Sequence, residues 1–166
     1  MHQPLAPSMA ELLARFPRAG KIEWIGVRPA RREALKELHS VNITFNGLEG
    51  DHRNRPGKRA VTLIQAEHLP AIAAMSGHDK IEPALLRRNI VVSGINLTAL
   101  KQLLVQVGTA QLRITGPCAP CSRMEEYLGE GGYNAMRGHG GVTAEVMLEG
   151  FCEVADAVTA VADTTG

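Results

Sequence analysis

The chain has 166 residues, 45% of them hydrophobic, which suits one domain with a core of its own. Its 18 lysines and arginines nearly balance its 17 aspartates and glutamates, so the formal net charge is only +1. This balance excludes a global field of the kind that draws a protein to nucleic acid or anionic lipid, and any basic site must be local. Aromatic residues form 4% of the chain, which argues against base-stacking platforms and a nucleic-acid partner.

The sequence shows no pattern typical of a membrane-spanning, secreted or disulfide-bonded protein. It has no run of about 18 apolar residues, and its N-terminus has neither the charged start nor the apolar stretch of a secretory signal. Three cysteines, an odd number, do not resemble a secreted disulfide framework and favour reduced thiols. We therefore expect a soluble, cytoplasmic protein with no membrane partner.

Hydrophobic patterning changes after the first twenty residues. The amphipathic piece Met9–Phe16 predicts a short helix ended by Pro17, and we expect residues 1–19 to be a helical appendage. From there, period-two runs and short apolar blocks bounded by Gly, Pro and Asn predict strands. The predicted strands are Lys21–Val27, Val41–Phe45, Arg59–Ile64, Asn89–Val92, Leu104–Val107, Ala110–Thr115 and Val142–Leu148.

Three further helices are predicted between the strands, at Gln65–Met75, Glu82–Arg88 and Ser122–Leu128. They are too few and too short to cover both faces of a parallel sheet, which disfavours a doubly wound fold. We predict a mostly β fold, a largely antiparallel β-barrel with a few short helices, over residues 20–160. The segment from Val154 reads as a last strand, with a flexible tail at 161–166.

Two cysteines, Cys118 and Cys121, lie two residues apart after an apolar strand and before a short charged helix. Backbone N–H groups at a helix start and the nearby Arg123 favour the thiolate form, which predicts a reactive sulfur. Two other interpretations remain open. A structural zinc site needs two more ligands, for which Cys152 and His139 are the candidates, and a redox dithiol usually lies in a βαβ context.

Two loops combine glycines with basic residues, as anion sites often do, at Gly47–Arg53 and Arg137–Val142. A third segment, Arg87–Asn89, leads two arginines directly into a strand, where a guanidinium could bind an anion. Each also has an ordinary structural interpretation, namely a hairpin turn, a surface loop and a solvated helix end. The candidate binding residues are Gly50, Asp51, His52, Arg53, Arg88, Asn89, Arg123, Arg137 and His139.

Together these segments resemble the MOSC domain family, named for the C-terminal domain of molybdenum cofactor sulfurases and also found as small stand-alone bacterial proteins. The resemblance spans Gly20 to Gly150, and the matching segments follow one another in the family's order. They are Gly47–Arg53, Arg59–Ile64, Arg88–Gly94, Gly108–Leu112, Pro120–Cys121 and Arg137–Val142.

The resemblance implies a barrel-like β fold and a cysteine that carries sulfur or ligates molybdenum in the pterin cofactor, molybdopterin. The family's thiol follows a proline, so the role of catalytic residue and metal ligand falls on Cys121, and Cys118 is extra. Soft sulfur is a reasonable ligand for molybdenum. The arginines Arg53, Arg88 and Arg137 would then hold the pterin phosphate. Related members reduce N-hydroxylated compounds, and others are proposed to pass sulfur to metal centres.

The chain also departs from the family's pattern. Residues 153–157 stand where the family often has a Gly-Asp turn between its last two strands, so we expect an altered hairpin. No lysine has a pyridoxal-phosphate-type context, and neither a desulfurase fold nor a ferredoxin cysteine set is present. Electrons or sulfur must therefore come from a partner protein. We also expect a small-molecule ligand or substrate, and a chain that is a monomer or a homodimer. A non-catalytic carrier or small-ligand module is the alternative, because holding an anion requires no chemistry.

Overall fold

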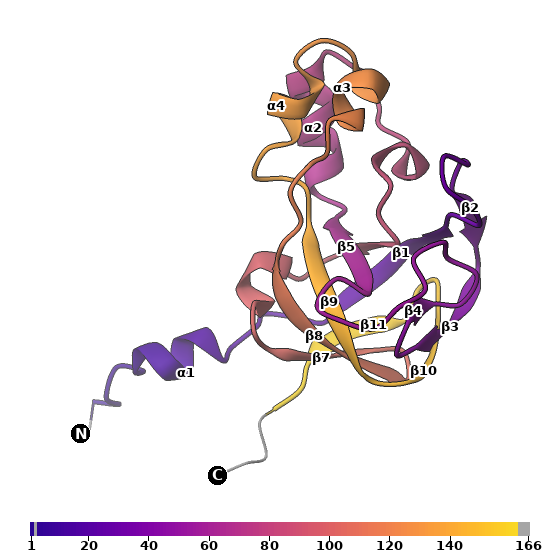
Figure 1. Cartoon of the computed structure of the whole chain (residues 1–166). Coiled ribbons are helices and arrows are strands. Elements are labelled where there is room, and N and C mark those ends of the chain that lie inside the picture. The colour runs from indigo at the N-terminus through magenta and orange to yellow at the C-terminus, as the bar shows by residue number, and fades with distance from the viewer. Residues whose placement is uncertain (2, 163–166) are drawn as a thin grey trace.

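Seven strands close into a β-barrel in this computed structural model, which describes residues 1 and 3–162 (Figure 1). They are β1 (Gly20–Val27), β5 (Val61–Gln65), β6 (Ile90–Ser93), β7 (Leu104–Val107), β8 (Ala110–Pro117), β9 (Val142–Leu148) and β11 (Ala157–Ala160). The order around the ring is β1, β11, β7, β8, β9, β5 and β6, and all neighbours are antiparallel except β5 and β6. The predicted mostly β, largely antiparallel barrel is confirmed.

Alternating burial along the strands shows why this sequence closes around a core. In β8, Ala110, Leu112 and Ile114 are fully buried, while the residues between them are only half-buried. Since successive side chains in a strand point to opposite faces, one set fills the interior of the barrel. The remaining strands lie outside this ring. They are β2 (Lys36–Leu38), which extends the sheet from β1, and a small sheet of β10 (Gly150–Glu153), β3 (Ser40–Thr44) and β4 (Gly47–Leu48).

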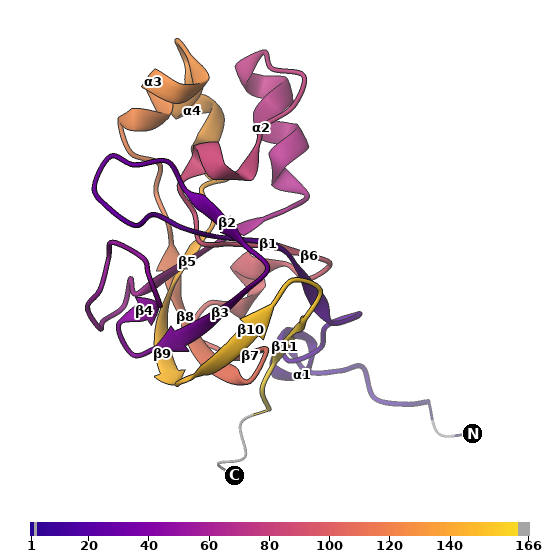
Figure 2. The ribbon, with the colours of Figure 1, turned by 90° about the vertical axis from the view of Figure 1, so that its right-hand side faces the viewer.

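Short helices gather at one end of the barrel, above it in Figures 1 and 2. They are α2 (His68–Ser76), α3 (Arg123–Leu128) and α4 (Gly132–Met136). With the 3-10 turn η1 (Pro83–Leu86), they share a second apolar cluster that includes Trp24, Ile72, Leu86, Met124 and Met136. A second 3-10 turn is η2 (Leu97–Leu100). This apolar cluster fixes the helices to the outside of the barrel, and with them the connections that leave β8 and enter β9.

The first helix, α1 (Met9–Leu13), has no buried residue and stands clear of the barrel in Figure 1. Ser8 and Glu11 form a capping box, in which the Ser8 hydroxyl accepts from the Glu11 N–H and the Glu11 carboxylate accepts from the Ser8 N–H. No helix among the described residues is long and apolar enough to span a membrane.

Several predicted boundaries were wrong for identifiable reasons. The helix predicted at Glu82–Arg88 is only the turn η1, because Arg87 adopts a left-handed φ of 62° that ends it. The helix expected from Gln65 begins at His68, since Gln65 still belongs to β5. The elements β2, β4, β10 and α4, between two and five residues long, were not predicted, because so few residues establish no periodicity. Residues 163–166 of the predicted tail lie outside the described residues.

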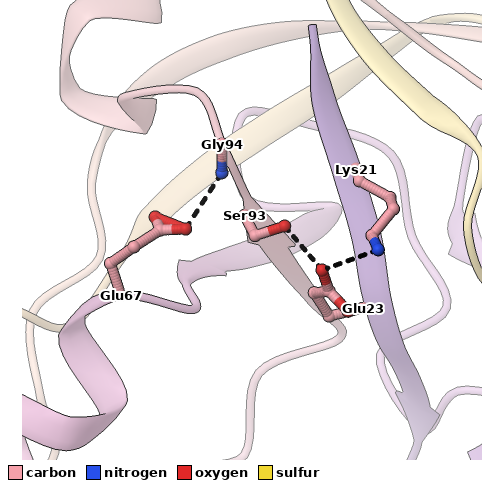
Figure 3. A network of polar contacts seen from close by, with 5 residues as sticks. All are labelled: Lys21, Glu23, Glu67, Ser93 and Gly94. Atoms are coloured by element: carbon pink, nitrogen blue, oxygen red, sulfur yellow. Dashed lines mark hydrogen bonds and ion pairs between the residues drawn. The ribbon is translucent and has the colours of Figure 1, made fainter.

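A polar network on the outer surface links β1, β6 and the start of α2 (Figure 3). The Ser93 hydroxyl donates to the Glu23 carboxylate at 2.7 Å, and the Lys21 ammonium pairs with the same carboxylate at 3.3 Å. The Ser93 bond is the main cause that lowers the pKa of Glu23. Glu67 accepts from the Gly94 N–H at 2.9 Å, which holds the chain where it leaves β6.

The turn between β10 and β11 contains a non-glycine residue with a positive φ. Ala155 adopts a left-handed φ of 79°, and Asp156 closes the turn by accepting from the Glu153 N–H at 2.9 Å. The Ala155 N–H donates to the Ile22 carbonyl at 2.8 Å, so the turn is tied to β1. An alanine thus holds a conformation that costs an L-residue about 1–2 kcal/mol.

Replacing Ala155 with Gly should therefore stabilise the protein. Relief of the left-handed strain outweighs the greater entropy that glycine adds to the unfolded chain, for a net gain of about 0.5–1 kcal/mol. In a chain of this size that corresponds to an increase in Tm of about 1–4 °C by calorimetry. The matched control is Ala157→Gly in β11, which should lower Tm; a decrease for both variants would contradict the strain at Ala155.

Candidate functional site

Strand register brings several strand ends together at one side of the barrel. Pro117 in β8 lies opposite Val142 in β9, and Val142 lies opposite Leu63 in β5. Leu63 in turn pairs with Ile90 in β6, which faces Ile25 in β1. The loops that adjoin these positions border a cavity of about 460 Å³, which we call the Cys121 cavity. Residues far apart in the chain therefore share one hollow.

Arginine dominates the lining of the Cys121 cavity. Among the described residues, seven arginines line it, together with a single carboxylate, that of Asp51. The arginines are Arg28, Arg31, Arg53, Arg59, Arg87, Arg88 and Arg123. The three ion pairs found within residues 1 and 3–162 include none of them. The cavity thus carries a local positive charge that the near-neutral chain does not have as a whole, and it suits an anionic ligand.

Two of these arginines have donors without acceptors. In the described part of the chain, the Nε atoms of Arg28 and Arg53 are buried and have no hydrogen-bond partner. Burial lowers the pKa of Arg53, and repulsion from Arg55 and Arg59 lowers it further. A bound anion would supply the missing acceptors and offset this repulsion.

Cys121 is exposed and lines the cavity from the connection between β8 and α3. The Cys118 N–H donates to the Gly141 carbonyl at 2.8 Å, which continues the pairing of β8 with β9 by one residue. The Cys121 carbonyl accepts from the Met124 N–H at 3.0 Å at the start of α3. The thiol therefore sits on a connection held at both ends and remains accessible to a ligand.

Arg88 has a structural position that the sequence did not indicate. It is buried, and its guanidinium donates to three carbonyls, those of Gly140 at 2.7 Å, Leu86 at 3.2 Å and Ala119 at 3.2 Å. It therefore ties the segment that carries Cys121 to the glycine loop before β9. Gly140 permits the approach, because a Cβ there would lie 2.1 Å from the Cys118 carbonyl oxygen.

Asn89 and Asp51 organise the arginine loops. The Asn89 amide donates to the Gly26 carbonyl and to Asp51, both at 3.2 Å, and its oxygen accepts from the Thr62 N–H at 3.1 Å. Asp51 accepts from the Arg28 N–H at 2.9 Å. Burial raises the pKa of Asp51, and the Asn89 bond acts against this. The side chains of Asn89 and Asp51 therefore form their hydrogen bonds with other groups of the protein, and the Asp51 bond positions Arg28 at the cavity.

The structure brings together six of the nine predicted binding residues, namely Asp51, His52, Arg53, Arg88, Asn89 and Arg123. The other three do not line this cavity. Gly50 lines a separate polar hollow beside β3 and β10, and Arg137 lines a different cavity next to α4. His139 packs edge-to-face on His68, with ring centroids 4.8 Å apart. The backbone of the glycine loop at 137–142 therefore lies beside the segment that carries Cys121, but the side chains of Arg137 and His139 do not line the Cys121 cavity.

The ligands that a zinc site needs do not meet. Cys152 is buried in the barrel core on β10, where burial raises its pKa to about 12, and His139 lies beside His68. Within the described residues, no three His, Cys, Asp or Glu side chains form a group able to hold a metal ion. Cys118 is buried and Cys121 is exposed, and both are free thiols.

Four arginines of the cavity were not among the predicted binding residues, namely Arg28, Arg31, Arg59 and Arg87. The sequence contained one signal, which is the position of two of these arginines at strand ends. Arg28 directly follows the predicted strand that ends at Val27, and Arg59 is the first residue of the predicted strand Arg59–Ile64. Arginines at strand ends cluster when the barrel brings those ends together, but periodicity does not show which ends meet.

A family model for the MOSC domain matches residues 37–159, which is most of the chain. The chain belongs to the MOSC domain family. The fold of this MOSC domain is similar to that of the YuaD protein from Bacillus subtilis, at a TM-score of 0.74 and 20% identity over 85% of this chain and 94% of that one. It is also similar to YiiM from Geobacillus stearothermophilus, at a TM-score of 0.70 and 19% identity over 89% and 77%.

YiiM from Escherichia coli matches this MOSC domain at a TM-score of 0.67 and 18% identity, over 90% of this chain and 73% of that one. Identities this low establish a shared fold and nothing about shared ligands. Among curated proteins, none matches the chain.

Arg88 should contribute to the stability of this MOSC domain more than the other cavity arginines do. Arg88→Met leaves three carbonyls without their donor and should lower the free energy of unfolding by about 2–4 kcal/mol. The control Arg59→Met removes an exposed guanidinium and should change it by no more than about 0.5 kcal/mol. Urea denaturation measures both; equal small effects would show that the Arg88 bonds do not hold the loops.

The His68–His139 contact predicts a pH dependence. Burial lowers the pKa of His68 below its ordinary value of 6.5, and the neighbouring His139 lowers it further. Protons then bind more readily to the unfolded chain, so this contribution to stability is complete above about pH 6.5 and falls as the pH drops. Between pH 8 and pH 5, wild type should lose more unfolding free energy than His68→Gln. Parallel curves for the two proteins would contradict the prediction.

Proposed function

We propose that this MOSC domain binds the molybdenum pterin cofactor in the Cys121 cavity, with the Cys121 thiolate as the protein ligand of the metal. One observation carries the proposal: an exposed free thiol lines the same cavity as seven arginines that have no carboxylate partners in the described ion pairs. The family resemblance supplies the identity of the ligand, and the cavity supplies groups suited to it.

The residues present fit the two chemical parts of this cofactor. Its phosphate needs cationic donors, and the buried Nε atoms of Arg28 and Arg53 lack acceptors. Its metal accepts soft sulfur ligands, and Cys121 offers one at the wall of the cavity. Arg31 and Arg123 add positive charge at the same wall. Arg88, whose donors already serve three carbonyls, would position the segment that carries the thiol and not hold the phosphate.

When bound, the cofactor would supply two-electron chemistry, which in related members reduces N-hydroxylated compounds. The balanced reaction consumes two electrons and two protons, breaks the N–O bond and releases the reduced nitrogen compound and water. The electrons would come from a donor protein. The role of the chain is to bind and orient, with the arginines holding the anionic part and Cys121 anchoring the metal part.

A sulfur or cofactor carrier is the second candidate, and the exposure of Cys121 favours it specifically. A carrier must present its sulfur to a partner protein, and an exposed thiol on a well-held connection permits this. In this role the Cys121 thiolate would take the outer sulfur from a persulfide on a donor protein, which leaves as a thiolate. An acceptor thiolate would then attack that outer sulfur, so that one S–S bond forms as the other breaks and the Cys121 thiolate is released. The arginines would bind an anion without turnover.

The deciding measurement is the molybdenum and pterin content of protein purified from a molybdenum-replete host. Wild type should retain both, Cys121→Ala should retain at least about tenfold less metal because the soft ligand is lost, and Cys118→Ala should retain nearly the wild-type amount. Cys121 is exposed, so its replacement should leave the thermal unfolding midpoint of the cofactor-free protein unchanged.

Other results would overturn the cofactor proposal in distinct ways. Wild-type protein with a persulfide on Cys121 and no molybdenum would establish the carrier. Equal losses in Cys118→Ala and Cys121→Ala would point to a dithiol site, and one equivalent of zinc to a structural metal.

A further inference from the structure

A second cavity of about 460 Å³ lies against the other side of the segment that carries the thiol. Cys118 and Ala119 line both cavities, so this short segment is the wall between them. The second cavity is bordered by the end of β8, the start of β9, η2 and α4, and we call it the α4 cavity. In Figure 1, α4 lies on one side of the β8–α3 connection and the loop between β1 and β2, which carries Arg28 and Arg31, on the other.

The charged groups of the α4 cavity have one sign. Lys101 and Arg137 are the charged side chains among its described lining residues, and no carboxylate accompanies them. Neither belongs to an ion pair found in residues 1 and 3–162. The Arg137 guanidinium reaches the Asn134 amide oxygen only at 3.4 Å. Two cations from separate elements thus face one hollow without counter-charge, which favours an anionic ligand.

The rest of the α4 cavity suits a flat apolar ring. Its walls include Pro117, Pro120, Val142 and the half-exposed ring of Tyr133. Gly116 is buried, yet a Cβ placed on it would meet no atom within 4 Å apart from its chain neighbours, so the space beside it is open. Ligand pockets commonly have about 300–1,000 Å³ and combine apolar walls with a few polar groups, as this one does.

We propose that the α4 cavity is a second small-molecule site, for a ligand that joins one planar ring to one anionic group, a carboxylate or a phosphate. Lys101 and Arg137 bind the anion, while the ring lies against Tyr133 and the two prolines beside Gly116. The site does not depend on the cofactor proposed for the Cys121 cavity. Its ligand would touch the Cys118–Pro120 segment, and this contact links the site to the thiol.

Binding of 1-naphthyl phosphate to the full chain, measured by calorimetry and by backbone amide NMR, tests the proposal. Its two halves, 1-naphthol and inorganic phosphate, should each bind at least about tenfold more weakly, because the site needs ring and anion together. 1-Naphthoate distinguishes the carboxylate from the phosphate. The amides of Gly116, Tyr133 and Gly138 should shift, since these residues line the α4 cavity.

Variants separate this site from the arginine-rich one. Lys101→Ala and Arg137→Ala should each weaken binding of 1-naphthyl phosphate about tenfold or more, and Gly116→Val should do the same by filling the space without changing charge. The control Lys36→Ala, an exposed cation on β2 that lines neither cavity, should leave it unchanged.

Three outcomes would overturn the α4 site. These are equal weakening by Lys36→Ala and Arg137→Ala, no effect of Gly116→Val, or binding of 1-naphthol as tight as that of 1-naphthyl phosphate. Molybdenum content of the same variants is read separately, so failure here leaves the cofactor proposal standing.

Discussion

The guanidinium of Arg88 is the interaction on which the rest of the site depends. Its three bonds hold the glycine loop before β9, the turn η1 and the segment that carries Cys121 in one arrangement. Because a buried cation needs hydrogen-bond acceptors, the three carbonyls and the arginine stabilise one another. The segment between Cys118 and Cys121 thereby becomes a fixed wall, with a cavity on each side of it.

Charge is distributed unevenly over this nearly neutral chain. A formal net charge of +1 hides an arginine-lined cavity and a second one that contains Lys101 and Arg137, because the acidic residues lie mainly elsewhere on the surface. Asp51, the carboxylate of the first cavity, accepts from the Arg28 N–H and the Asn89 amide. The protein thus preorganises positive charge for a ligand and does not neutralise it internally, which favours anion binding. The cost is seen at Arg53, whose pKa is lowered first by burial and then by repulsion from Arg55 and Arg59.

Much of the fold was predictable, and the limits are local. Leu104–Val107 and Val142–Leu148 form strands with the predicted bounds. A strand with one face in a core alternates apolar and polar residues, and this alternation can be recognised in the sequence. For the site, Cys121 and Arg53 were predicted to lie close together, and both line the Cys121 cavity. Their roles in binding stay predictions. Arg137 lines the α4 cavity instead, because it ends α4, a five-residue helix whose position no sequence pattern indicated.

The sequence by itself determined which segments extend, where the soft sulfur and the arginines lie along the chain, and that any basic site had to be local. Local patterns encode these features because they depend on neighbouring residues alone. Only the tertiary structure decided that β11 closes the ring on β1, that Cys118 is buried while Cys121 faces solvent, and that Arg88 serves carbonyls from three segments. Those outcomes depend on hydrogen bonds and packing between residues distant in the chain, which periodicity does not specify.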